Sequence, residues 1–190
     1  MYSIFRFLFK IHFSIFIRYK VIGLENIPME GKVILAGNHK NNYDSPLLMR
    51  VVKRKVHFIA KKELIDSKLG FIYKRLGIIP VDRESHNNKK SLDKAIECLN
   101  NGEIVAIFPE GTFNKTEYVI KPFKIGAVYL ASQGDSPIVP FAIKGEYKWF
   151  RKNVTIEFGK PYNIEDKKDL RKENITLTNK VIRLLRNESN

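Results

Sequence analysis

The sequence has little of several features that mark specialised protein classes. It contains one cysteine, Cys98, in 190 residues, which excludes an intramolecular disulfide and a zinc cage built from several cysteines, and fits a reducing compartment. Its longest apolar runs, 104–108 and 127–131, are five residues each, whereas a helix that spans a bilayer needs about 18. The glycine-rich fingerprints of nucleotide-binding loops do not occur. We therefore expect neither a hydropathic transmembrane helix nor a common nucleotide site.

Acidic residues are scarce beside basic ones. The chain carries 34 Lys and Arg against 20 Asp and Glu, a formal net charge of +14. Its length fits one domain, and its 44% hydrophobic and 28% charged residues are ordinary for a globular protein. So large an excess of positive charge predicts an anionic partner, and lipid headgroups, phosphorylated small molecules and nucleic acid all carry that charge.

The first twenty residues differ in composition from the rest. They hold seven aromatic side chains, and no Asp or Glu occurs before Glu25. On a helix, one narrow stripe is polar and the other faces are apolar apart from His12; the stripe consists of Ser3, Arg6, Lys10, Ser14 and Arg18. Such a helix either lies in a membrane interface with its basic residues at the lipid phosphates, or packs on the domain as an ordinary buried element. A signal peptide is disfavoured because charges interrupt the apolar segment.

From Lys20 onward, short β-branched runs alternate with longer helical patterns. Strands are predicted at 33–36, 56–60, 78–81, 104–108, 138–143 and 154–158, and helices at 46–53, 67–76, 87–101, 122–132 and 167–186. The strand candidates are mostly apolar throughout, as buried parallel strands are. The sequence therefore predicts a single α/β domain with a mostly parallel central β-sheet flanked by helices.

Polar residues directly follow three of these strands, where the ligand crevice of a parallel sheet lies. His39 and Asp44 follow the strand at 33–36, Asp82 and Arg83 follow 78–81, and the segment 109–112 follows 104–108. The three strand ends are therefore expected to deliver titratable groups to one edge of the sheet.

His39 and Asp44 have the residue types of a general base and its orienting carboxylate. No Gly-x-Ser-x-Gly elbow is present, and Cys98 lies within a predicted helix with nothing beside it in sequence to activate it. A general base and its orienting carboxylate, without a nucleophilic side chain, imply that the nucleophile is a hydroxyl group of the substrate. The alternative is that Asp44 caps the following helix and His39 is a satisfied loop histidine. His57, within an apolar strand, is interpreted as a satisfied or surface histidine.

The order of the motifs resembles the 1-acyl-sn-glycerol-3-phosphate acyltransferase (phospholipid and glycerol acyltransferase) family over about residues 20 to 160. The blocks are His39-x4-Asp44, Lys61-x-Glu63-Leu64 running to Gly77-Ile-Ile-Pro-Val-Asp-Arg83, Phe108-Pro-Glu-Gly-Thr112, Pro122-Phe-Lys-Ile-Gly-Ala127 and Val139-Pro-Phe141. The pattern of the first twenty residues predicts an amphipathic membrane-associating helix over 1–20, and the resemblance implies an acyltransferase catalytic domain over 21–190 that acts at the cytoplasmic face of the membrane.

The resemblance also implies a reaction and roles for the matched residues. His39 would take the proton of a lysophospholipid hydroxyl, Asp44 would orient His39, and Arg83 would grip the acceptor phosphate. The candidate substrate-binding residues are Arg83, Glu110, Gly111, Thr112, Lys61 and Lys124. The acyl donor would be a thioester of coenzyme A or of acyl carrier protein, the acceptor most plainly 1-acyl-sn-glycerol 3-phosphate, and no metal, bound cofactor or nucleic acid is implied.

One position departs from the family pattern. Phe113 follows Thr112 where family members commonly carry Arg. Lys115, Lys121 or Lys124 could supply the charge instead, or the acceptor headgroup could differ. The alternative function is a non-catalytic basic module that binds anionic membrane or nucleic acid, in which His39 and Asp44 would have no reason to converge.

Overall fold

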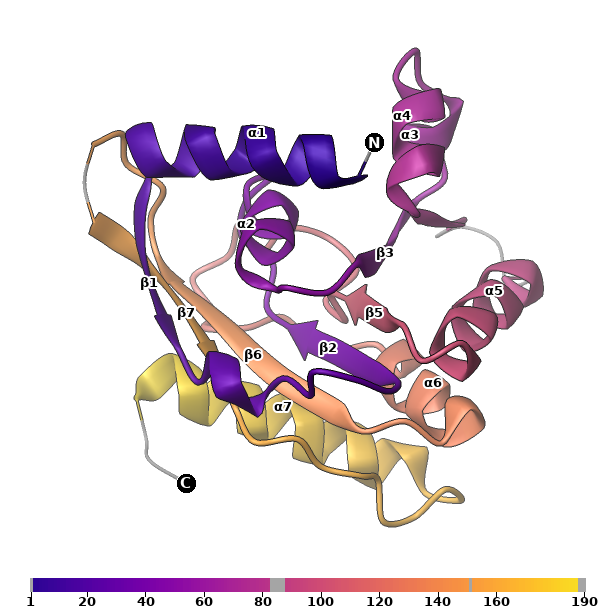
Figure 1. Cartoon of the computed structure of the whole chain (residues 1–190). Helices are drawn as coiled ribbons and strands as arrows, with labels where there is room; N and C mark the ends of the chain where they lie inside the picture. Colours follow the sequence, from indigo (N-terminus) through magenta and orange to yellow (C-terminus); the bar gives the residue numbers. More distant parts are fainter. Residues whose placement is uncertain (1, 83–87, 151, 188–190) are drawn as a thin grey trace.

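The computed structural model describes residues 2–82, 88–150 and 152–187, and in it one twisted sheet separates two layers of helices (Figure 1). The strands are β1 (Arg18–Ile22), β2 (Val33–Gly37), β3 (Val56–Lys61), β4 (Ile79–Val81), β5 (Ile104–Ile107), β6 (Ile138–Gly145) and β7 (Lys152–Phe158). Their order across the sheet is β1-β7-β6-β2-β5-β3-β4. All neighbouring pairs are parallel except β6 and β7. The predicted mostly parallel α/β fold is confirmed.

The central strand β2 shows why its sequence is apolar without alternation. Val33 and Leu35 point into the hydrophobic core on one face of the sheet, while Ile34 and Ala36 belong to the core on the other face. Because both faces of β2 are covered, each of these side chains is buried. The parallel neighbours β5 and β6 hold β2 from both sides.

The helices divide between the two faces of the sheet. They are α1 (Tyr2–Ile15), α2 (Asp44–Val51), α3 (Glu63–Asp66), α4 (Gly70–Leu76), α5 (Lys89–Asn100), α6 (Gly126–Gly134) and α7 (Leu170–Arg186), with a 3-10 turn, η1 (Leu24–Asn26). Helices α1 and α2 pack on one face, and α5, α6 and α7 cover the other (Figure 1). No helix within the described residues is both long and apolar enough to cross a membrane.

Two predicted helices differ from the observed ones. The helix expected over 67–76 begins only at Gly70, as α4, and a separate short helix, α3, lies before the expected range. The chain folds tightly between the two helices, since a side-chain carbon at Gly70 would lie 1.8 Å from the carbonyl oxygen of Ile65. The N-terminal helix ends at Ile15, so that Arg18 opens the edge strand β1 rather than extending the helix. The expected boundary between residues 20 and 21 falls within β1.

Helix α1 has two apolar faces. One face packs on the core and includes Phe13, which is fully buried, with Tyr2, Phe5 and Phe9 beside it. The other face exposes five large apolar side chains: Ile4, Phe7, Leu8, Ile11 and Ile15. Packing on the domain, one of the two interpretations of this helix, therefore accounts for only one of its apolar faces.

Candidate active site

The loop that follows β2 carries the first polar residues of the site and is fixed to the sheet by Asn38. The buried side-chain amide of Asn38 donates a 3.0 Å hydrogen bond to the carbonyl oxygen of Ile143 and accepts a 2.7 Å bond from its N–H. These two bonds tie the loop to β6. The position of His39, the next residue, is thereby set by the central sheet.

His39 and Asp44 are in contact. Nδ1 of His39 lies 2.8 Å from Oδ2 of Asp44, and because a carboxylate only accepts, Nδ1 carries a proton, which leaves the lone pair of the neutral ring on Nε2. The same oxygen accepts bonds of 2.7 and 2.8 Å from the N–H groups of Lys40 and Asn41. Asp44 thus binds the loop that precedes α2, and the hydrogen bonds that its carboxylate accepts come from this loop and from Tyr147 rather than from N–H groups of the helix. The alternative that Asp44 serves as a helix cap is wrong.

The second oxygen of Asp44 is held by Tyr147. The Tyr147 hydroxyl donates a 2.8 Å hydrogen bond to Oδ1 of Asp44, so the fully buried carboxylate accepts four hydrogen bonds in all. Burial, together with the neighbouring carboxylate, raises the pKa of Tyr147 well above its ordinary value of 10.0. The hydroxyl therefore remains a donor at every physiological pH.

The His39 ring is packed between aromatic rings. It stacks on Phe108, with ring centroids 3.9 Å apart and planes 15° from parallel, and Phe113 lies 4.4 Å away on a tilted plane. Only 13% of the His39 side chain is exposed. Phe113, which stands where the family pattern has Arg, therefore contacts the imidazole rather than offering a charge.

The side chain of Glu110 holds the backbone on which His39 lies. Its Oε1 accepts a 2.7 Å bond from the N–H of His39, and its Oε2 accepts a 2.8 Å bond from the N–H of Lys121. The side chain is buried, and burial raises the pKa of Glu110 above 4.5 although the two N–H groups act in the opposite direction. Glu110 joins the loops after β2 and β5, which agrees with a role in shaping the site.

The remaining predicted substrate-binding residues lie at different places relative to His39 and Asp44. Gly111 has φ +71°, and a side chain there would meet the Lys124 stem about 3.1 Å away, so this glycine admits Lys124 over the loop. Lys61 and Thr112 are exposed. Arg83 lies outside the described residues.

A cavity of about 570 Å³ opens beside the loop after β5, between α5 and α6. Phe108, Gly111 and Lys124 line it together with apolar side chains of β3 and β5, Ile59 and Ile107. Phe108 also stacks on His39, so one residue of the cavity wall contacts the imidazole, although His39 itself does not line the cavity.

The family can be assigned by comparison with known proteins. A family model described as Acyltransferase matches residues 18–144. The chain belongs to the acyltransferase family. The resemblance seen in its motifs is thus confirmed, and the match runs from β1 to β6, so that the loops bearing His39, Asp44 and Glu110 lie inside the acyltransferase region.

Relatives of this acyltransferase carry related names. The 1-acyl-sn-glycerol-3-phosphate acyltransferase of Bacillus subtilis is 37% identical over 128 residues, which are 66% of this chain and 62% of the relative. The enzyme of the same name from Haemophilus influenzae is 30% identical over 164 residues, 77% of this chain and 67% of the relative. Against the first of these relatives, the chain spans less than two thirds of the length.

A solved structure shares the fold of this acyltransferase. The crystal structure of the 1-acyl-sn-glycerophosphate acyltransferase from Thermotoga maritima matches with a TM-score of 0.76 and 21% identity, covering 98% of this chain and 79% of the other. At that identity the likeness concerns the fold alone.

Tyr147 is the residue that sequence reasoning missed. It comes two positions after β6, whose carboxyl end lies at the same edge of the sheet as that of β2. The rule that singled out His39 and Glu110 therefore applies to Tyr147 as well. It carries no formal charge and lies outside the matched motif blocks, the last of which ends at Phe141, so its place after the strand is its only signal in the sequence.

Proposed function

We propose that the chain is an O-acyltransferase that moves a fatty acyl group from a thioester of coenzyme A or acyl carrier protein to the free hydroxyl of a lysophospholipid. The favoured acceptor is 1-acyl-sn-glycerol 3-phosphate, which would yield phosphatidic acid, and the names of the relatives support it. The observation that carries the proposal is the 2.8 Å contact between His39 and Asp44, on a loop fixed by Asn38 and Glu110.

In the proposed reaction, Nε2 of His39 takes the proton of the acceptor hydroxyl as its oxygen attacks the thioester carbonyl. The new C–O bond forms, the C–S bond breaks, and the proton passes from the imidazolium to the leaving thiolate. Asp44 keeps Nδ1 protonated and stabilises the imidazolium. No protein nucleophile is required, which fits a site whose polar groups are a base and its supports.

The cavity beside Phe108 is the proposed place of the acceptor. Its apolar walls suit hydrocarbon, and Lys124 brings a cation next to the catalytic loop. Lys115, Lys121 and Lys124 are the lysines that could bind the acceptor phosphate. The Nζ of Lys121 donates a 3.0 Å hydrogen bond to the carbonyl oxygen of Phe113. Lys124, which lines the cavity, is therefore the lysine favoured for this task.

Membrane contact through α1 completes the proposal. The outward apolar face of α1 continues toward the exposed Trp149 and Phe150, since Phe16 contacts Trp149 with ring centroids 5.2 Å apart. Aromatic side chains of this kind favour the water–lipid interface. An enzyme at the surface of a membrane avoids drawing an acyl chain into water, at about 0.8 kcal/mol per methylene. A place at the cytoplasmic face, peripheral or monotopic, remains part of the proposal.

The decisive experiment measures acyl transfer by the purified protein to a panel of lysophospholipids. The donors are long-chain acyl thioesters of coenzyme A and of acyl carrier protein. We expect transfer to 1-acyl-sn-glycerol 3-phosphate, and a fall of about 100- to 10,000-fold in kcat for His39→Ala. Thermal unfolding of this variant should match the unmodified chain. Transfer only to another lysophospholipid would refute 1-acyl-sn-glycerol 3-phosphate as the acceptor. If the folded protein transferred no acyl group to any acceptor, the non-catalytic basic module would be favoured instead.

A further inference from the structure

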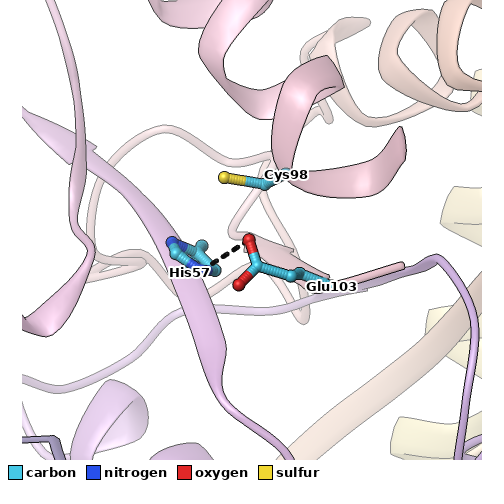
Figure 2. A group of neighbouring side chains, drawn as sticks. All are labelled: His57, Cys98 and Glu103. Atoms are coloured by element: carbon cyan, nitrogen blue, oxygen red, sulfur yellow. Dashed lines mark ion pairs between the residues drawn. The ribbon is translucent and has the colours of Figure 1, made fainter. Parts of the chain in front are cut away.

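Three potential metal ligands meet at the edge of the sheet opposite the candidate active site (Figure 2). His57 is the second residue of β3, Glu103 directly precedes β5, and Cys98 lies in the last turn of α5. They are close because β3 and β5 are parallel neighbours in which Val56 lies opposite Ile104, and because α5 leads directly into β5. None of the three contributes to the site around His39.

The His57 ring is held with one nitrogen bonded and the other without a hydrogen bond. Nδ1 lies 2.9 Å from the carbonyl oxygen of Gly77 and must donate to it. Gly77 has φ +82°, and a side-chain carbon there would lie 2.7 Å from Nδ1, so the glycine lets the ring approach the backbone. Nε2 is buried and has no hydrogen-bond partner. In the neutral ring, Nε2 therefore presents a lone pair.

Glu103 faces that lone pair. Its Oε2 lies 3.2 Å from Nε2, within ion-pair distance, although Nε2 makes no hydrogen bond to it. A carboxylate oxygen and a nitrogen lone pair repel each other at this distance unless a proton or a cation lies between them. The geometry thus calls for a positive charge at this point.

Cys98 provides the third ligand atom. The buried thiol stands beside the other two groups, and the ligand atoms of all three residues lie within 4.8 Å of one another. Burial raises the pKa of the Cys98 thiol, and the neighbouring Glu103 carboxylate adds to the effect, so without a cation the sulfur keeps its proton. Ligands of a tetrahedral zinc ion are roughly 3.3 to 3.8 Å apart. The three groups need only a small closing movement to reach that spacing.

We propose that Nε2 of His57, Sγ of Cys98 and the carboxylate of Glu103 bind a divalent transition metal ion, with Zn²⁺ the ion that best suits this nitrogen, sulfur and oxygen set. The thiol releases its proton to solvent when the metal–sulfur bond forms. The Glu103 side chain is 34% exposed, which leaves room for entry and for a water molecule as the fourth ligand. The ion fastens α5 to the starts of β3 and β5, and so acts on stability rather than on acyl transfer.

The test uses the full chain, freed of metal by a chelator and titrated with Co²⁺ as a spectroscopic probe. We expect one equivalent to bind, with a thiolate-to-cobalt charge-transfer absorption that Zn²⁺ abolishes by displacement, and a melting temperature that rises with the Zn²⁺ concentration. Cys98→Ser should lose the absorption, and His57→Gln and Glu103→Gln should bind at least about tenfold more weakly. Glu97→Gln, an exposed carboxylate on the same helix, is the matched control and should bind normally.

Two results would overturn the proposal. One is cobalt absorption that is missing, or that persists in Cys98→Ser, since the sulfur would then not be a ligand. The other is a His57 ring that NMR shows to be doubly protonated at neutral pH and unchanged by added Zn²⁺, because a proton would then occupy the place assigned to the metal. Should His57→Gln fail to fold, Cys98→Ser and Glu103→Gln still decide the matter.

Discussion

The Tyr147 hydroxyl and the Asp44 carboxylate, 103 residues apart in the chain, form a 2.8 Å hydrogen bond at the candidate active site. Through this bond the end of β6 holds the carboxylate that orients His39. Asp44 is fully buried, and a buried charge depends on each hydrogen bond that it receives. In the proposed reaction Tyr147 is therefore a positioning residue, which touches Asp44 and would act on the imidazole through it.

Replacing Tyr147 with Phe removes this bond while keeping the ring. We expect kcat to fall about tenfold with KM for the acceptor nearly unchanged, and unfolding to become easier by about 1–3 kcal/mol, because Oδ1 of Asp44 loses its partner. Steady-state kinetics and denaturant unfolding measure both. Tyr118→Phe, at an exposed tyrosine, is the control. In an Asp44→Asn background the effect of Tyr147→Phe on kcat should nearly vanish; a full tenfold effect there would contradict the positioning role.

Phe113 should matter for catalysis through its contact with His39. The rings are 4.4 Å apart, so Phe113→Leu loosens one side of the imidazole and should lower kcat several-fold, whereas Phe113→Tyr, which keeps the ring, should restore it. Phe71→Leu, at an exposed phenylalanine on α4, serves as the control. A raised acceptor KM with unchanged kcat in Phe113→Leu would instead assign the ring to acceptor binding.

Lys124 is expected to bind the acceptor phosphate. Lys124→Gln should raise KM for a phosphate-bearing acceptor about tenfold with little change in kcat, because it removes a charge-assisted contact that the ground state and the transition state share. An acceptor without phosphate should show no such increase. Lys115→Gln, outside the cavity lining, is the matched variant. Equal KM values for Lys124→Gln and the unmodified chain would show that a residue other than Lys124 binds the acceptor phosphate.

The strands that the sequence predicts well are those that are buried on both faces. The apolar run at 33–36 became β2 with one further residue, Gly37, because no other environment suits four consecutive apolar side chains in so short a segment. The strand β1 was not predicted, since it includes Arg18 and Lys20 and lies at the edge, where only β7 pairs with it. Its apolar pattern is correspondingly weak.

For the site, the sequence indicated the pairing of His39 with Asp44 and the convergence of the loops after β2 and β5, where Glu110 meets His39. His39 and Asp44 share one loop and its helix, and a spacing of five positions indicated their pairing. Tyr147, like the group of His57 and Glu103, depends on which strands are neighbours in the sheet. Periodicity predicts that strands exist but not their order, so these contacts could not be derived from the pattern.

The raised pKa of Glu110 predicts how the free energy of unfolding depends on pH. Since burial raises its pKa above 4.5, the folded chain holds this proton to a higher pH than the unfolded chain does. Between the two pKa values the free energy of unfolding therefore falls as pH rises. Denaturant unfolding of the unmodified chain and of Glu110→Gln from pH 4 upward should show the stability advantage of the former shrinking through this window. An advantage of the unmodified chain over Glu110→Gln that instead grows with pH would refute the raised pKa of Glu110.

The outward face of α1 carries the prediction for membrane binding. Deleting the helix would also remove Phe13 from the core, so loss of binding after deletion would not separate lipid contact from folding. A variant with Phe7, Leu8 and Ile11 changed to Ser leaves the inward face intact and should unfold much as the unmodified chain does. In flotation with anionic vesicles, we expect its bound fraction to fall at least about tenfold, because three apolar contacts with the bilayer are lost. Activity on detergent-dispersed acceptor should be retained. Ile175→Ser, at an equally exposed position on α7 across the sheet, should float normally, and equal flotation of the triple variant would show that α1 does not bind the membrane through this face.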